Sequence, residues 1–127
     1  ENFFRPGNPF GKGVTDIVMI NAYSNVEDYY EDFVGTVLNG ATQEILKIDP
    51  KVKFIVALGA WKEPPLWEKP EPTHLLNDYE QAIKTRQLLA IAFFKYGARE
   101  GNGWWLPDRS RGSAELWELI RKTNKVE

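Results

Sequence analysis

The chain has 127 residues, no cysteine and a net charge of −2 that comes from 16 basic and 18 acidic residues mixed along its length. This length fits one domain or part of a larger one, and it suffices for a packed core without covalent cross-links. The charge balance offers no basic surface for nucleic acid, and the apolar runs are too short to cross a membrane. The absence of cysteine excludes disulfides, thiolate zinc sites and a cysteine nucleophile. We therefore expect a soluble protein, and we interpret the start at Glu1, which has no signal-peptide pattern, as a processed, truncated or excised terminus.

The first predicted strand lies near the start of the chain. Residues 1–13 combine Gly, Pro and Asn with three Phe residues, which indicates an ordered loop. Asp16 to Tyr23 is then a continuous apolar run rich in β-branched residues, as is typical of a strand buried on both faces. Residues 14–50 as a whole are expected to form a first βα unit.

A long helix is predicted after this strand. Ser24 and Glu27 have the spacing of a capping box, and apolar residues recur at helical intervals over residues 30–48. The helix is expected to end before Pro50. Gly40 makes a break there conceivable, because glycine weakens a helix by about 1 kcal/mol relative to alanine.

Residues 51–88 predict a second βα unit. The run 52–60 is apolar and short, as a buried strand should be. Residues 62–73 contain four prolines around Trp67, which predicts an extended loop without regular structure, and loops of this length are usually functional. Asn77 is expected to cap a short helix, with Glu80 three residues later.

Residues 89–127 predict the third unit. We assign a strand to residues 90–96 because aromatic residues are dense there and Gly97 follows them, although no Gly or Pro separates this run from the preceding helix, which can also simply continue through it. A loop rich in Gly and Trp is expected over residues 97–112. Ser113 then caps a last helix, whose apolar face carries Leu116, Trp117 and Ile120.

Strands that alternate with helices imply an α/β fold with a parallel sheet and right-handed crossovers. Three strands fall below the usual four to six. Either the chain borrows neighbouring strands from another subunit, or it is a piece of a larger α/β domain. We favour the second interpretation, by analogy with closed barrels, which remove the edges of a sheet.

Functional residues of parallel α/β proteins gather at the carboxyl ends of the strands. Four of the five tryptophans follow a predicted strand or lie in one of the long loops. The flat face of a tryptophan packs on the apolar face of a sugar, whereas amides, carboxylates and guanidinium groups bind its hydroxyls. The sequence therefore predicts a carbohydrate site, and the alternative is that Trp104 and Trp105 plug the mouth of the barrel or pack under their own loop. The residues expected to bind the ligand are Asn21, Tyr23, Trp61, Trp67, Tyr96, Arg99, Trp104, Trp105 and Asp108.

Three segments resemble the last three strands of a glycoside hydrolase of the (β/α)₈ barrel type. They are Asp-Ile-Val-Met-Ile-Asn-Ala-Tyr at 16–23, Phe-Ile-Val-Ala-Leu-Gly-Ala-Trp-Lys-Glu-Pro-Pro at 54–65, and Ala-Phe-Phe-Lys-Tyr-Gly at 92–97 with Gly-Trp-Trp-Leu-Pro-Asp at 103–108. The likeness extends from about residue 16 to residue 120 and identifies no particular family. It implies one catalytic carboxylate and a tryptophan platform in these closing strands, a second carboxylate on an earlier strand, and a slight preference for a secreted or cell-surface protein.

Hydrolysis of a glycosidic bond requires two carboxyl groups, about 5 Å apart for retention and about 6.5–9.5 Å apart for inversion. Glu63 is the foremost candidate because it directly follows the second strand and lies beside Trp61 in the sequence; the alternative is a solvated start of a loop. Glu100 competes with it, although it can equally be a turn residue, and Asp108 is a weaker third candidate.

Other chemistries have less support. His74 is the only histidine, so no multi-histidine metal site can form, and its proline-rich surroundings predict an exposed loop residue. The glycine pairs 11/13 and 101/103 lack the context of phosphate-binding loops, and Lys95 is a remote candidate for a Schiff base. No cofactor, metal, nucleic acid or membrane partner is expected. Two further hypotheses are a non-catalytic binding domain that uses the aromatic loops and an inactive fragment of a larger enzyme.

Overall fold

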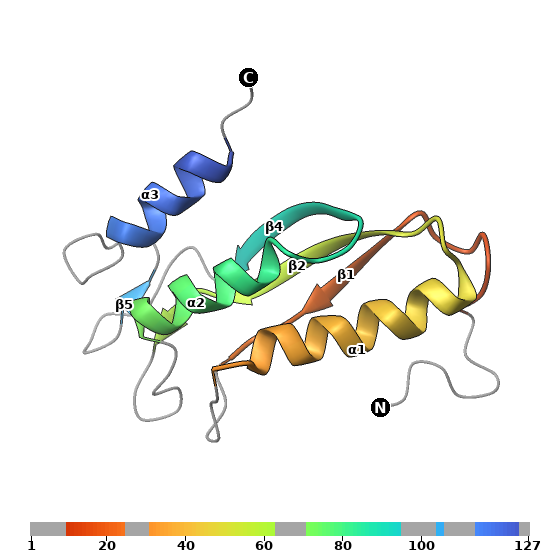
Figure 1. Ribbon diagram of the computed structural model, residues 1–127, viewed down its shortest axis with the longest axis horizontal. Helices are drawn as coiled ribbons and strands as arrows, with labels where there is room; N and C mark the ends of the chain where they lie inside the picture. Colours follow the sequence, from red (N-terminus) through yellow and green to blue (C-terminus); the bar gives the residue numbers. More distant parts are fainter. Residues whose placement is uncertain (1–9, 25–30, 63–70, 95–103, 106–113, 125–127) are drawn as a thin grey trace.

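The secondary structure alternates between strands and helices, as the sequence predicts. The structure is a computed structural model that describes residues 10–24, 31–62, 71–94, 104–105 and 114–124. Its elements in chain order are β1 (Ile17–Asn21), α1 (Phe33–Ile48), β2 (Lys53–Gly59), β3 (Trp61–Lys62), α2 (Pro72–Ala82), β4 (Leu88–Phe94), β5 (Trp104–Trp105) and α3 (Ala114–Thr123), as Figure 1 shows. The protein is thus of the α/β class. No helix of the described ranges is long and apolar enough to cross a membrane.

The main sheet is parallel and has the strand order β1-β2-β4, which confirms the predicted sheet. β1 pairs with β2 from Ile17 opposite Lys53 to Asn21 opposite Ala57. β2 pairs with β4 up to Gly59 opposite Phe94, with an irregularity of register between Phe54 and Ile55. All three strands therefore point the same way, and their carboxyl ends meet at one edge of the sheet.

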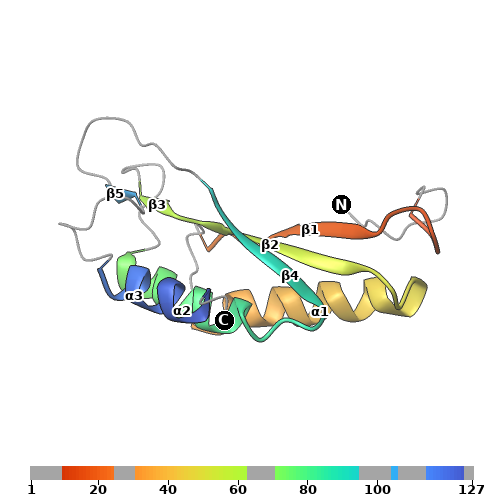
Figure 2. The same ribbon diagram turned by 90° about the horizontal axis from the view of Figure 1, so that it is seen from above.

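All three helices cover the same face of this sheet (Figure 2). Phe54, Val56 and Leu58 alternate along β2 and are fully buried on that face. They form one core with buried side chains from β1 and all three helices, namely Ile20, Val34, Leu38, Ile45, Leu75, Tyr79, Ala82 and Leu116. Burying large aliphatic or aromatic side chains contributes about 1.5–3 kcal/mol each, so this core is the main source of stability.

The opposite face of the sheet carries the alternate residues of each strand. Ile17, Met19 and Asn21 are exposed on β1, and Phe94 is exposed on β4. Met19 retains 56% of its accessible surface and Phe94 retains 51%. Within the described ranges no helix lies on this face, and its outer strands present apolar side chains to the surroundings.

Helix α1 differs from the prediction at its start and in its continuity. Its N-cap is Asp32, so Ser24 is not the cap, and Glu27 lies outside the described residues. The helix also runs through Gly40 without a break and ends at Ile48, as expected. Its buried stripe of Val34, Leu38 and Ile45 explains this continuity, because packing against the sheet outweighs the cost of one glycine.

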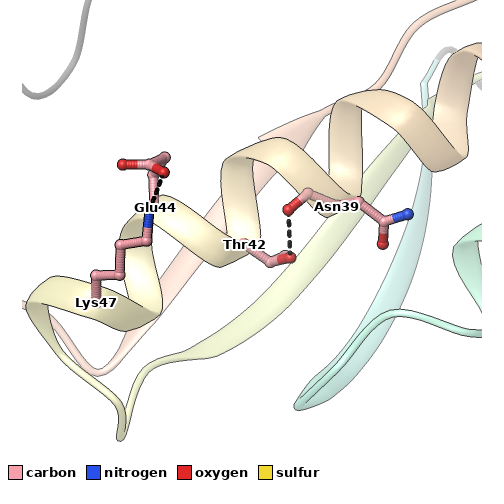
Figure 3. Close-up of polar contacts among 4 residues, drawn as sticks. All are labelled: Asn39, Thr42, Glu44 and Lys47. Atoms are coloured by element: carbon pink, nitrogen blue, oxygen red, sulfur yellow. Dashed lines mark hydrogen bonds and ion pairs between the residues drawn. The ribbon is translucent and has the colours of Figure 1, made fainter.

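Figure 3 shows two side-chain contacts within α1, that between Thr42 and Asn39 and that between Lys47 and Glu44. Thr42 is buried, and its hydroxyl donates to the carbonyl oxygens of Leu38 at 2.7 Å and Asn39 at 3.4 Å. On the exposed side, the Lys47 ammonium lies 2.5 Å from the Glu44 carboxylate. Such exposed ion pairs contribute little to stability, so α1 is held by its apolar stripe.

Helix α2 begins earlier than predicted, because its N-cap lies six residues before the expected cap at Asn77. Its N-cap is Glu71 and its first residue is Pro72, so the expectation of an irregular loop over residues 62–73 is wrong at both ends, with Lys62 already in β3. Proline is favoured at the first helical position, where its missing N–H removes no hydrogen bond. His74 is consequently a partly buried helix residue, and its Nδ1 accepts the Glu71 backbone N–H at 2.9 Å.

The third strand is confirmed over the alternative of a continued helix. Gln87 separates α2 from β4 with a φ of 54°, a left-handed conformation that ends helical winding without glycine. Its side-chain amide donates to the carbonyl oxygens of Val52 at 2.5 Å and Pro50 at 3.1 Å, which offsets the strain. β4 begins at Leu88, two residues earlier than predicted.

The last predicted loop and helix are partly confirmed. Residues 104–105, expected in a loop, form the short strand β5, which pairs with β3. α3 places Leu116 in the core with Trp117 and Ile120 packed against it, as predicted. The predicted cap at Ser113 lies outside the described residues.

Candidate functional site at the carboxyl ends of the strands

Three aromatic side chains from three different strand ends are in mutual contact. Tyr23 follows β1, Trp61 follows β2 and Phe94 ends β4. The ring centroid of Trp61 lies 5.6 Å from that of Tyr23 and 5.3 Å from that of Phe94, edge-on in both cases, whereas Tyr23 and Phe94 are stacked at 5.7 Å. We call these three residues the aromatic cluster. Each such ring pair contributes about 0.5–1.5 kcal/mol beyond the burial of its surface, so the cluster holds the strand ends together.

The rings of the cluster differ in accessibility. Trp61 is 7% exposed, so this predicted sugar-binding residue is buried rather than an accessible platform. Tyr23 is half-buried and Phe94 is half-exposed. Asn21, two residues before Tyr23 in the chain, is exposed and offers an amide. The accessible aromatic surface here is therefore supplied by Phe94 and Tyr23, with Trp61 as their support.

The short antiparallel pair β3–β5 extends from the same edge of the sheet. Trp61 pairs with Trp105, and Lys62 pairs with Trp104. This backbone ladder connects the segment after β2 to the segment after β4, although the two are more than 40 positions apart in the sequence. Two of the predicted binding residues, Trp104 and Trp105, are thereby brought to the carboxyl end of β2.

Backbone hydrogen bonds fix the strand ends. The Ala60 N–H donates to the Phe94 carbonyl oxygen at 2.5 Å, and the Ala22 N–H donates to the Ala57 carbonyl oxygen at 2.9 Å. The first bond holds the chain beside Trp61 against Phe94, and the second continues the β1–β2 pairing one residue past Asn21. The backbone that carries Trp61 and Phe94 is thus fixed by direct strand pairing.

A buried polar contact follows directly after Tyr23. The hydroxyl of Ser24 donates to the carboxylate of Asp78 on α2, and both residues are essentially inaccessible to solvent. A buried carboxylate requires hydrogen-bond partners, because leaving it unpaired costs several kcal/mol. Sequence patterns did not indicate Asp78. A single charged residue is ordinarily expected to be exposed, even where it lies between apolar residues such as Leu75 and Ala82.

Most of the other predicted site residues lie outside the described residues. These are the candidate catalytic residues Glu63 and Glu100, the candidate Schiff-base residue Lys95, and the candidate binding residues Trp67, Tyr96, Arg99 and Asp108. The described residues bring together Asn21, Tyr23 and Trp61. They add Phe94, which prediction overlooked because the third strand was expected to continue to residue 96, whereas β4 ends at Phe94.

The titratable group with the clearest perturbation lies at the other end of the sheet. Asp49 follows α1, and its carboxylate accepts the backbone N–H groups of Gly13 at 2.8 Å and Lys51 at 3.0 Å. These hydrogen bonds, that from Gly13 first, lower the pKa of Asp49 below 3.8. This carboxylate therefore stabilises the amino-terminal edge of the sheet and is remote from the aromatic cluster. Among the described residues, no group of three acidic, histidine or cysteine side chains is arranged to hold a metal ion.

The chain matches no family model, no curated protein and no solved structure. The geometry of the strand ends is consequently the basis for assigning a function.

Proposed function

We propose that the chain is a segment of a (β/α)₈ barrel that acts on or binds a glycan at the carboxyl ends of its strands, in the manner of a glycoside hydrolase. The strand order supports the barrel. In a doubly wound sheet helices cover both faces and the strand order reverses at some point, whereas in a barrel the strands follow in sequence and all helices lie outside. β1, β2 and β4 follow in sequence, and α1, α2 and α3 share one face.

The apolar face without helices gives a second argument for the barrel. Barrel interiors are filled by alternate strand residues, mostly branched and apolar. Met19, Ile55 and Ala90 lie in register across that face, followed by Asn21, Ala57 and Ala92, while Ile17 lies beside Lys53 at the amino-terminal end. Moreover, the outer strands β1 and β4 carry no charged residue or proline of the kind that protects a free edge. Neighbouring strands on both sides would complete such a sheet.

The aromatic cluster is the single observation that carries the functional proposal. Phe94 presents an exposed ring stacked on Tyr23, with the Asn21 amide close along β1. A pyranose packs its C–H face on such rings and bonds its hydroxyls to amides, so the surface suits a sugar better than it suits a phosphorylated or strongly charged ligand.

The binding test uses two exposed apolar residues at opposite ends of β4. We expect Phe94→Ala to weaken the binding of oligosaccharides by about tenfold or more in titration calorimetry, which corresponds to about 1.4 kcal/mol. Leu89→Ala is the matched control, because Leu89 is 49% exposed but lies at the amino-terminal end of the strand. A panel of gluco-, galacto-, manno-, xylo- and chito-oligosaccharides covers the common ring types. Failure of the whole panel to bind, or equal losses in both variants, contradicts the proposal.

We assign catalysis to one of two carboxylates, Glu63 or Glu100, which follow β3 and β4 in the sequence. We expect the chain, completed by its neighbouring strands, to hydrolyse aryl glycosides, and Glu63→Gln or Glu100→Gln to reduce kcat by a factor of about 10² or more without weakening the binding of oligosaccharide. If neither substitution lowers kcat, the catalytic carboxylates lie elsewhere.

A non-catalytic glycan-binding domain is the second candidate. The accessible rings of Tyr23 and Phe94 and the nearby Asn21 amide are suited to holding a sugar, and none of these groups is a carboxyl group of the kind that glycoside hydrolysis requires. Binding of an oligosaccharide that depends on Phe94, combined with no hydrolysis of any aryl glycoside, favours this candidate over the enzyme.

A further inference from the structure

Three side chains of α2 hold the two ends of the segment that connects β1 to α1. We infer that Asn77, Asp78 and Gln81, which we call the α2 clamp, position Tyr23 for the glycan site by holding Ser24 and Glu31, the described residues on either side of 25–30. Asp78 binds Ser24 at the beginning of this segment. Asn77 and Gln81 donate from their side-chain amides to the Glu31 carbonyl oxygen at its end, at 2.8 Å and 2.5 Å. The inference rests on the proposed function and adds positioning residues to that site.

Tyr23 needs this anchor because it lies beyond the paired part of β1. Trp61 and Phe94 are held by the bond between the Ala60 N–H and the Phe94 carbonyl oxygen. The pairing of β1 with β2 continues to Ala22, and the next residue is Tyr23. The hydroxyl bonded to Asp78 belongs to Ser24, directly after it. Asp78 thus fixes the backbone on the far side of Tyr23 and limits where its ring can lie against Trp61 and Phe94.

The clamp also reaches the start of α1. The Gln81 side-chain oxygen accepts the Gly35 backbone N–H at 2.6 Å, while its amide nitrogen donates to Glu31. This arrangement satisfies one of the N–H groups that every helix leaves free in its first turn. It also requires a close approach, because a Cβ at Gly35 would lie 2.9 Å from that oxygen of Gln81. One helix therefore sets both where the first βα loop leaves the sheet and where it enters α1.

The burial of the Asp78 carboxylate distinguishes a positioning role from ordinary packing. Asp78 is 1% exposed and occupies the stripe of α2 that otherwise carries Leu75, Tyr79 and Ala82. An apolar residue would pack there without the cost of desolvating a carboxylate, and buried polar groups are retained in several proteins because they specify one conformation. The carboxylate fits that use here, since its partner Ser24 adjoins the cluster.

The test measures the cluster by near-ultraviolet circular dichroism, which responds to the packing of aromatic rings and requires no sugar. The band of the cluster is assigned as the part of the spectrum lost in Tyr23→Leu. We expect Ser24→Ala and Asp78→Ala each to reduce this band, and the double variant to lose no more than Asp78→Ala alone, because the Ser24 hydroxyl acts through Asp78. Asp78→Asn should retain the band, since its amide oxygen can accept the Ser24 hydroxyl. Glu80→Ala, an exposed neighbour on α2, should leave the spectrum unchanged.

The same variants are then titrated with the oligosaccharide that the unmodified chain binds best. We expect Ser24→Ala and Asp78→Ala to weaken binding about tenfold, the equivalent of one hydrogen bond to a charged group, and Asp78→Asn to restore it. Ser24→Ala removes one oxygen atom and keeps the test valid if Asp78→Ala does not fold. Spectra of Ser24→Ala and Asp78→Ala that match Glu80→Ala, or losses that add in the double variant, overturn the inference. Absence of sugar binding in the unmodified chain refutes the proposed function and leaves the dichroism to decide on the clamp.

Discussion

Replacing Trp61 tests whether the aromatic cluster holds the carboxyl ends of the strands together. Trp61→Leu keeps an apolar side chain but removes two edge-on ring pairs, those with Tyr23 at 5.6 Å and with Phe94 at 5.3 Å. At about 0.5–1.5 kcal/mol for each pair, the loss is about 1–3 kcal/mol. The smaller buried surface of leucine adds about 1 kcal/mol, because Trp61 is only 7% exposed. We therefore expect the free energy of unfolding to fall by about 2–4 kcal/mol.

Urea denaturation followed by far-ultraviolet circular dichroism measures this change. With an m-value of about 2 kcal/mol/M, the midpoint should fall by roughly 1–2 M urea. Trp61→Phe is the matched control, because it reduces the buried surface but keeps a ring for both neighbours, and we expect it to lose about half as much. Equal losses in the two variants, within about 0.5 kcal/mol, would refute the contribution of the ring pairs.

Two further predictions concern parts of the fold remote from the cluster. Gly40→Ala should stabilise α1 by about 0.5–1 kcal/mol, since nothing lies within 4 Å of the added Cβ. Gly35→Ala should be about 1–2 kcal/mol less stable than Gly40→Ala, because its Cβ displaces the Gln81 side chain. Equal urea midpoints of the two variants would contradict this prediction. The lowered pKa of Asp49 implies that its carboxylate stabilises the fold fully above the unfolded value of 3.8 and loses this effect as the pH falls through the lower folded value. Melting temperatures of the unmodified chain and Asp49→Asn should therefore differ by a constant amount at neutral pH, and this difference should shrink as the pH falls below 3.8; a difference that does not shrink there would contradict the assignment.

The elements that the sequence predicted correctly are those with a strong local pattern. β1 and β2 are continuous apolar runs, and the buried stripe of α1 recurs at helical spacing, so both periodicities match the observed burial. β4 was predicted from its aromatic density and from the rhythm of the earlier units. β4 is actually separated from α2 by Gln87, whose backbone is left-handed. The residue type glutamine does not indicate this conformation.

The errors arose where a side chain has a partner far away in the sequence. Ser24 has the spacing of a helix cap, but its hydroxyl binds Asp78, 54 positions away. Asn77 has the same local pattern, yet its amide binds the Glu31 carbonyl oxygen, and α2 begins at Pro72, which was taken as a helix breaker. Capping patterns are local, and tertiary hydrogen bonds that compete for the same side chains cannot be read from them.

The candidate site was predictable in position and only partly in composition. The rule that parallel strands present their carboxyl ends at one edge brought Asn21, Tyr23 and Trp61 to the same place. It gave no measure of burial, so Trp61 was expected to be an accessible platform, whereas the accessible ring is that of Phe94. Burial depends on the neighbours that the other strands supply, which appear only once the sheet is assembled.

The most direct test of a glycan site on the aromatic cluster is to follow the ring resonances of individual aromatic residues by NMR during titration with an oligosaccharide. Tyr79 and Phe93 provide an internal control, because they form a stacked pair at 5.9 Å on the helix-covered side of the sheet. We predict that the resonances of Tyr23 and Phe94 shift in a saturable way while those of Tyr79 and Phe93 stay in place. Unchanged Tyr23 and Phe94 resonances, or equal shifts in both pairs, would contradict the account.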